Sequence, residues 1–370
     1  MDRPVRVLTP LRAAGPGGRP HGEAAPTTAR ARADGRHRVT TDVAQERAGA
    51  GGGRPRVARV VPTLDLASAS GADLADALIT TSCVLIVGHD VAPDLRRAMA
   101  EVTAAFFDLP RGEKARVRWP GDGAWRGWQP VTEGVPELTG ARVPDLVERF
   151  EAQELESFTM WPERPVELRD TWFAYNAECR RVTSRLIELL AEGLALPTED
   201  VPAWTEHQYA NLCVNNYPAL AEPPLPGQLR TGAHTDRGGI TLLAADAAPG
   251  GLEVRLPTTG EWLGVTIPAD AYLVQVGDLF ARWTNLVVHG NVHRVVNPPP
   301  DVAATARRQS VVYFHYPHLD TVVVPAASCV ARSGRGALPP LQAREHLLRR
   351  QAAFADDPEV RSGELDGVPA

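Results

Sequence analysis

The sequence predicts a mainly β protein, an antiparallel sandwich or barrel with helices at its flanks. Between residues 207 and 325, short apolar runs recur between clusters of Pro, Gly and Asn, which is typical of many short strands in such folds. Residues 168–189 instead carry one apolar stripe at helical spacing, and shorter helical patterns occur at 93–109 and 339–355. Apolar residues make up 44% of the 370 residues, which is enough for a sizeable core.

The first 57 residues have a composition unlike that of the rest. They contain eleven arginines and five acidic residues, so they carry about +6 and the remaining chain about −12. They are also rich in Gly, Pro and Ala and show no periodicity, which predicts a disordered basic extension. The acidic remainder is a poor match for a polyanion, so we expect no nucleic-acid partner.

Ordered structure is expected from residue 58 onward. The apolar runs at 57–68 and 83–91 predict a short strand and a buried strand. The helix that follows has Pro93 in its first turn and Pro110 after its end. Its apolar residues are spaced by four, three and four: Leu95, Met99, Val102 and Phe106.

An aromatic loop and a long helix precede the predicted strands. The loop covers residues 119–140, where three side chains either cover a substrate or pack in the core: Trp125, Arg126 and Trp128. The apolar stripe of the helix predicts a structural spine, and Gly193 and Pro197 mark its end. The stripe consists of Leu168, Trp172, Tyr175, Cys179, Val182, Leu186 and Leu189.

The cysteines and the apolar runs indicate a cytoplasmic protein. The four cysteines, at positions 83, 179, 213 and 329, are scattered without a Cys-x-x-Cys pair. This argues against a disulfide framework and against a thiolate zinc site. No apolar run approaches the roughly 18 residues of a membrane span, and the N-terminus lacks the apolar core of a secretory signal. We therefore expect no membrane association.

Three His-x-acid triplets occur in the chain, at 21–23, 234–236 and 318–320, so the triplet alone decides nothing. On a strand, residues i and i+2 point to the same face, so His234 and Asp236 present an imidazole and a carboxylate side by side. His293, in another predicted strand, is the natural third ligand. Two histidines and one carboxylate leave the remaining metal positions free, which is the arrangement of non-haem Fe(II) oxygenases.

A second pair of polar residues follows the metal motif. Arg308 and Ser310 are again i and i+2 on a predicted strand, so a guanidinium and a hydroxyl share one face. Such a pair suits a carboxylate through charge-assisted hydrogen bonds. A metal-binding face with this carboxylate clamp nearby is what an Fe(II) and 2-oxo-acid site requires. Phe314 lies on the same face and either lines the pocket or packs in the core.

Three motifs in this order resemble the isopenicillin N synthase-like family of Fe(II)/2-oxoglutarate-dependent dioxygenases. They are "HTD" at 234–236, "GDLFARWTNLVVHGNVHRVV" at 277–296 and "RQS" at 308–310. "VPTLDL", "VGHDV", "RGWQP" and "NNYP" extend the resemblance over most of 58–355. The resemblance implies a double-stranded β-helix (jelly-roll) core with an α/β N-terminal region and a long spine helix. It also implies that the iron ligands are His234, Asp236 and His293. Arg308 and Ser310 would then hold the distal carboxylate of 2-oxoglutarate, with Asn215 and Tyr217 as helpers.

Some features depart from the family's pattern. The family's usual Asn-His-Gly is Gly88-His89-Asp90 here, and residues 298–306 lengthen what we interpret as a hairpin loop between His293 and Arg308. His289 lies four residues before His293, shares its strand parity and is the rival third ligand, although "HRV" matches the family's motif. No Arg-x-Ser follows His318, so we do not interpret it as a ligand.

The resemblance implies an enzyme that uses Fe(II), 2-oxoglutarate and O2 and that releases succinate and CO2. It would hydroxylate, desaturate or cyclise a small molecule, because halogenating relatives lack the carboxylate that Asp236 supplies. The predicted setting is specialised metabolism, for example antibiotic biosynthesis, in a monomer or weak dimer. Two alternatives remain open. One is a 2-oxoglutarate-independent iron oxidase or cyclase, and the other is a non-catalytic or zinc-binding barrel.

We expect four parts along the chain. They are the extension at 1–57, an N-terminal α/β region with the spine helix at 58–200, the metal-binding double-stranded β-helix at 201–325, and a C-terminal helix and tail at 326–370.

Overall fold

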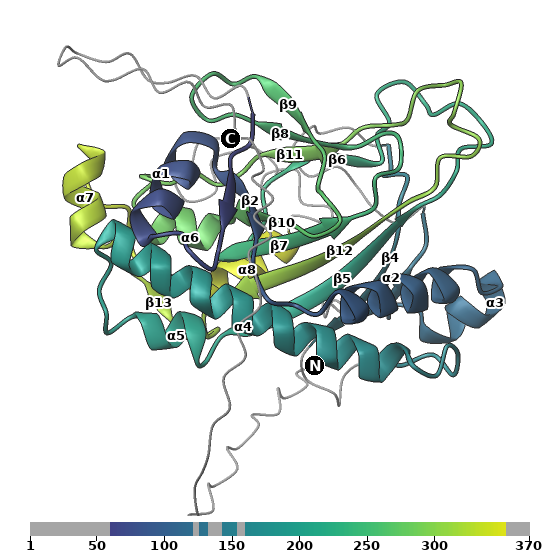
Figure 1. The fold of residues 1–370 in the computed structure, drawn as a ribbon, viewed down its shortest axis with the longest axis horizontal. Helices are drawn as coiled ribbons and strands as arrows, with labels where there is room; N and C mark the ends of the chain where they lie inside the picture. Colours follow the sequence, from purple (N-terminus) through teal and green to yellow (C-terminus); the bar gives the residue numbers. More distant parts are fainter. Residues whose placement is uncertain (1–59, 121–125, 132–142, 154–159, 353–370) are drawn as a thin grey trace, which may run out of the picture. The chain divides into compact units, whose positions relative to one another are not determined.

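The computed structural model describes residues 60–120, 126–131, 143–153 and 160–352. The expected extension at 1–57 and Trp125 lie outside these residues. Within them, a large and a small β-sheet form the core and helices cover the outer face of the large sheet (Figure 1). The structure therefore confirms the predicted mainly β fold with flanking helices.

The large sheet has eight strands, and all of its neighbouring strands are antiparallel except the first two. Strands from the N-terminal half extend it at both edges, so both halves of the described chain contribute to one sheet. Its order is β1 (Thr63–Asp65), β2 (Cys83–Val87), β10 (Tyr272–Val276), β7 (Ile240–Ala245), β12 (Arg308–Tyr316), β5 (Tyr209–Tyr217), β4 (Glu148–Gln153) and β3 (Gly127–Gln129).

The small sheet has four antiparallel strands, in the order β6 (Thr231–His234), β11 (His293–Val295), β8 (Leu252–Arg255) and β9 (Trp262–Val265). Apolar side chains of both sheets pack between them: Leu252, Val254 and Val295 come from the small sheet, and Leu243 and Val312 from the large one. Two-residue strands β13 (Val322–Val323) and β14 (Leu341–Gln342) form a separate pair.

The spine helix α4 (Leu168–Leu194) runs along the outer face of the large sheet, as Figure 1 shows, and the prediction of this helix is confirmed. Its apolar stripe shares one core with Ala210, Leu212 and Val214 of β5. Because successive strand residues point to opposite faces, the residues between these three face away from α4, toward the small sheet. The other helices are α1 (Gly71–Thr81), α2 (Pro93–Phe107), α3 (Arg111–Lys114), η1 (Ala115–Val117), α5 (Val201–Thr205), α6 (Asp278–Trp283), α7 (Ala327–Ser333) and α8 (Ala343–Ala352).

The predictions for two loops need correction or refinement. The segment between His293 and Arg308 is not a hairpin loop, because β11 and β12 belong to different sheets and do not pair. It crosses from one sheet to the other. The aromatic loop at 119–140 contains the short strand β3, where Trp128 is buried and donates its Nε1 hydrogen to Glu148 Oε2 at 2.8 Å, so this tryptophan packs in the core.

None of the helices in the described part of the chain is long and apolar enough to span a bilayer.

Candidate active site

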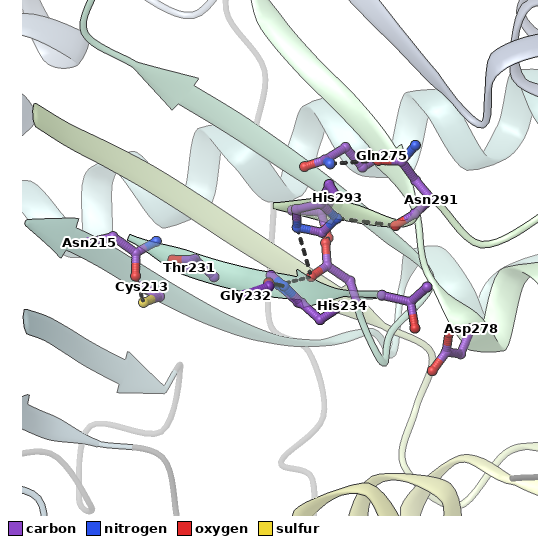
Figure 2. Close-up of polar contacts among 12 residues, drawn as sticks. Cys213, Asn215, Thr231, Gly232, His234, Gln275, Asp278, Asn291 and His293 are labelled. Carbon is purple, nitrogen blue, oxygen red and sulfur yellow. Dashed lines mark hydrogen bonds and ion pairs between the residues drawn. The ribbon is translucent and has the colours of Figure 1, made fainter. Parts of the chain in front are cut away.

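Three potential metal ligands lie close together at the paired strands β6 and β11 of the small sheet. His293 opens β11 and lies directly opposite His234, the last residue of β6, while Asp236 follows two residues later. The Nε2 atoms of both histidines lie 3.8 Å from Asp236 Oδ1. One ligand atom from each of the three residues lies within 4.8 Å of the other two (Figure 2). This spacing is that of donors arranged around a single ion.

Both histidines are held in the tautomer that can bind a metal. Nδ1 of His234 lies 2.9 Å from the carbonyl oxygen of Gly232, and Nδ1 of His293 lies 3.1 Å from that of Asn291. A carbonyl only accepts, so each Nδ1 carries the proton and each Nε2 keeps its lone pair facing Asp236. Burial, followed by the neighbouring His293, holds the pKa of His234 well below its usual value, which keeps it neutral.

Asp236 is oriented by a hydroxyl group. Thr241 Oγ1 donates to Asp236 Oδ2 at 2.6 Å, which leaves Oδ1 to face the two histidines. The residue that supports His293 is itself fixed, because Asn291 accepts from Gln275 Nε2 at 2.8 Å and donates to Ser82 Oγ at 2.9 Å. Such contacts behind the ligands set ligand orientation in metal sites. The sequence reasoning had not identified Thr241 or Asn291.

The predicted clamp residues share one face of the large sheet. Arg308 pairs with Tyr217 and Ser310 with Asn215, so all four side chains point to the same side. Asn215 Nδ2 donates to Ser310 Oγ at 3.4 Å, and the Arg308 Cζ lies 5.3 Å from the centre of the Tyr217 ring.

The side chain of Arg308 can donate a hydrogen bond to an anion. Its side chain is buried, and its Nη1 has no hydrogen-bond partner among the described residues. A buried guanidinium with a free donor is costly unless an acceptor completes it. Arg308 and Ser310 line the same cavity as the His234, Asp236 and His293 side chains. The donor set therefore fits a metal ion together with a carboxylate ligand.

Strand β4 forms a further polar wall of this cavity, which the sequence reasoning had missed. Arg149, Glu151 and Gln153 lie opposite Asn215, Cys213 and Asn211 of β5 and line the cavity. The signal was present in "ERFEAQ", where Phe150 and Ala152 alternate with the polar residues as in a half-buried strand.

The other residues considered from the sequence lie elsewhere or have other roles. His289 is half-buried between α6 and β11 and belongs neither to the ligand group nor to the cavity wall. His318 is exposed, and Asp320 pairs with Arg344 at 2.9 Å. Phe314 does line the cavity.

Known proteins match this chain over both of its halves. Residues 209–317 match the 2OG-Fe(II) oxygenase superfamily, and residues 61–173 match the family described as non-haem dioxygenase in morphine synthesis N-terminal. The validamycin A dioxygenase of Streptomyces hygroscopicus subsp. limoneus is 33% identical over 78% of this chain and 82% of its own length. A homoarginine-6-hydroxylase of Oryza sativa subsp. japonica is 27% identical over 70% of this chain and 81% of its own.

Solved structures agree with these matches. A Neurospora crassa protein in complex with alpha-KG and thymine superposes with a TM-score of 0.69, at 26% identity, over 79% of this chain and 96% of its own. A putative 2OG-Fe(II) oxygenase family protein from Caulobacter crescentus gives a TM-score of 0.66, at 25% identity, over 76% and 93%. With the double-stranded β-helix core confirmed and both sequence halves matched, the chain belongs to the 2OG-Fe(II) oxygenase superfamily.

Proposed function

We propose that this chain oxidises a small molecule in the cavity between its two sheets, with the following residues as the site. The iron ligands are His234, Asp236 and His293. Arg308 and Ser310, assisted by Asn215 and Tyr217, hold the distal carboxylate of 2-oxoglutarate. The observation that carries this assignment is that two free Nε2 atoms and one carboxylate oxygen meet in the cavity that Arg308 Nη1 also borders.

The chain is an Fe(II)- and 2-oxoglutarate-dependent dioxygenase. When bound, Fe(II) and 2-oxoglutarate would supply the oxidation, in which one O2 and one 2-oxoglutarate yield succinate, CO2 and one oxygen atom. That atom enters the substrate in hydroxylation, or leaves as water with two substrate hydrogens in desaturation or ring closure. The protein would hold the metal with two imidazole nitrogens and one carboxylate oxygen, a ligand set that leaves positions for further ligands. Arg308 orients the cosubstrate by neutralising its far carboxylate, while Ser310 adds a hydrogen bond.

The substrate class rests on the relatives and on the cavity. The relatives named for validamycin A and homoarginine support a small-molecule substrate, and the former supports a role in specialised metabolism. Because Asp236 supplies a carboxylate, hydroxylation, desaturation or ring closure is favoured over halogenation. All four cysteines are free and buried, which supports a cytoplasmic location, and we propose a monomer or weak dimer without a nucleic-acid partner.

The two alternative functions make different demands on Arg308. A 2-oxoglutarate-independent oxidase would use Arg308 and Ser310 to hold a carboxylate of its own substrate. A zinc hydrolase would need only the ligands and a bound water. The buried, incompletely bonded Arg308 beside the ligands favours a site that takes an anion together with the metal.

The test compares O2 uptake and succinate release by the purified protein loaded with Fe(II) or Zn(II), with and without 2-oxoglutarate. We expect both signals only with Fe(II) and 2-oxoglutarate together. O2 uptake without 2-oxoglutarate would favour the oxidase, and hydrolytic activity with Zn(II) would favour the hydrolase. His293→Ala should lose bound metal, whereas His289→Ala, the matched change at the rival histidine, should retain it.

A further inference from the structure

We propose that Glu151 binds a positively charged nitrogen, a protonated amine or a guanidinium, of the substrate. This inference rests on the proposed function, because it assigns the substrate class of the same cavity. It concerns Glu151 on the wall formed by β4, a residue that is neither a proposed iron ligand nor part of the proposed 2-oxoglutarate clamp.

Glu151 is a buried carboxylate that faces the cavity with few partners. Its side chain lies opposite Cys213 on β5, and only 5% of the residue is exposed. Asn211 Nδ2 donates to its Oε2 at 2.8 Å, and the Cys213 thiol lies beside the same carboxyl group. Within the described residues, no cation forms an ion pair with it. Buried carboxylates are normally paired, so a missing counter-charge in a cavity indicates a ligand.

The neighbouring arginines do not fill this role. Arg149 lies two residues earlier on the same strand. Its Nη2 is 3.6 Å from Asp145 Oδ2, and its Nε hydrogen is donated to Asn215 Oδ1 at 2.9 Å. Arg237 also lines the cavity, and its charge lowers the pKa of Glu151 less than the charge of Arg149 does. Burial raises the pKa of Glu151 despite the opposing effect of Arg149, which indicates that the charged form is not fully compensated. A cationic ligand would supply the missing charge, whereas a neutral hydroxyl would not.

The position of Glu151 suits a substrate rather than the cosubstrate. Along β5, Tyr217 lies opposite Arg308, while Cys213, four residues earlier, lies opposite Glu151. Four strand residues span about 13 Å. The carboxylate therefore lies four residues along the sheet from Arg308 and two from the pair of Ser310 and Asn215, on the side of the cavity lined by Gln153 and Tyr209. A cation bound there would place the rest of the substrate toward the proposed iron ligands.

The experiment uses a polar small-molecule extract of the organism that encodes the protein. The extract is separated at pH 7 on a cation exchanger into retained and unretained fractions. Each fraction is tested for stimulation of succinate release by the Fe(II)-loaded, full-length protein. We expect the stimulating compound in the retained fraction. Stimulation by the unretained fraction alone overturns the inference but leaves the proposed function standing, whereas no stimulation by either fraction overturns both.

A variant then tests Glu151 itself. Glu151→Gln keeps the shape and can still accept the hydrogen from Asn211, but it removes the charge. Losing a charge-assisted hydrogen bond corresponds to about a 10- to 100-fold loss in kcat/KM for the retained compound. Most of this loss should appear as a higher KM. Acetylating the compound's amine should cost the wild type a similar factor and the variant much less. Equal kcat/KM values for wild type and variant would overturn the inference.

The matched control is Glu148→Gln on the same strand. Glu148 points to the opposite face, where Lys114, Trp128 and Asn216 donate to its carboxylate. This variant should lower the melting temperature without changing the preference between the compound and its acetylated form. If Glu148→Gln changed that preference as much as Glu151→Gln, the loss of any buried charge on β4 would explain the result and the inference would fail.

Discussion

Thr241 Oγ1 lies 2.6 Å from Asp236 Oδ2, and this hydroxyl on the large sheet fixes a carboxylate that follows a strand of the small one. Asp236 lies beyond the end of β6, so strand geometry alone does not determine where its side chain points. The hydrogen bond directs Oδ1 toward the two histidines. Thr241 is therefore a positioning residue for the proposed metal site rather than a ligand.

Replacing Thr241 by Val should weaken metal binding while keeping the fold. The substitution preserves shape and removes only the hydroxyl that orients Asp236. Loss of such a supporting contact costs roughly 10-fold or more in metal affinity. The measurement is the Kd for Mn(II) or Co(II) by equilibrium dialysis. Thr103→Val is the matched control, because the Thr103 hydroxyl donates only to carbonyls within α2. Equal Kd values for Thr241→Val and the wild type would contradict the role.

Arg308 and Ser310 should contribute unequally to 2-oxoglutarate binding. Arg308→Gln removes a charge-assisted interaction, so we expect the Kd of 2-oxoglutarate to rise about 10- to 100-fold. Ser310→Ala removes one neutral hydrogen bond and should raise it only a few-fold. Calorimetric titration of the Mn(II)-loaded protein gives both values. An unchanged Kd in Arg308→Gln, combined with a raised substrate KM, would favour the 2-oxoglutarate-independent alternative.

The C-terminal helix α8 contacts Thr235, which lies between the proposed ligands His234 and Asp236. Arg350 donates through Nη2 to the carbonyl and hydroxyl oxygens of Thr235, at 3.4 and 3.3 Å. Its Nε lies 3.5 Å from Asp278 Oδ2, and the Asp278 amide in turn donates to the carbonyl oxygen of Asp236 at 2.8 Å. Leu347 of the same helix lines the cavity. The helix thus supports both the metal motif and the cavity wall.

Arg350→Met should raise the metal Kd by a few-fold, because it removes these contacts while keeping much of the side-chain volume. Arg349→Met is the matched control, since Arg349 is exposed and pairs with Glu345 on the helix surface, a kind of contact that contributes little. The same dialysis experiment compares the two variants. Similar Kd values for both would show that α8 does not position the motif.

The sequence predicted the elements whose pattern is local and repeated. The stripe of α4, the strands that carry His293 and Arg308, and the final helix all follow from periodicity or from motifs. Helix α1 was missed although its signal was present, because Ser70 and Asp73 form a capping box just before an apolar run. Strand β3 was missed because it has only three residues and lies in a loop, so only its pairing with β4 shows its role. Strand β4 was missed although its alternation is visible, and its pairing with β5 places it in the large sheet.

The residues of the site divide in the same way, into those that local sequence patterns indicate and those that only the tertiary structure shows. The roles proposed for His234, Asp236 and His293 came from spacing and from the family resemblance. Thr241 and Glu151 lie in no motif, and the motif at 277–296 does not show that Asn291 supports His293. Only the folded chain brings these residues to the cavity or behind the ligands. The sequence also does not show which sheet each strand belongs to, and for this reason it predicted a hairpin loop at residues 298–306.

The role of Gly193 also depends on tertiary structure. From the sequence we expect Gly193 to mark the end of the spine helix, yet α4 continues to Leu194. The residue that caps it, Ala195, has a left-handed backbone (φ 51°). Gly193 instead lies against Gly71 at the start of α1. A Cβ added to either glycine would collide with backbone atoms of the other element. The two glycines therefore allow α1 and α4 to approach closely.

Gly193→Ala should consequently destabilise the protein, even though alanine favours helices. Propensity alone would favour the variant by about 1 kcal/mol, but the collision with Gly71 forces α1 away from α4. We expect a net loss of about 1–3 kcal/mol, the usual cost of overpacking, measured as the free energy of unfolding in urea. Gly112→Ala in α3, where an added Cβ meets nothing within 4 Å, is the matched control and should not destabilise. A Gly193→Ala variant as stable as that control would show that the helices can separate without cost.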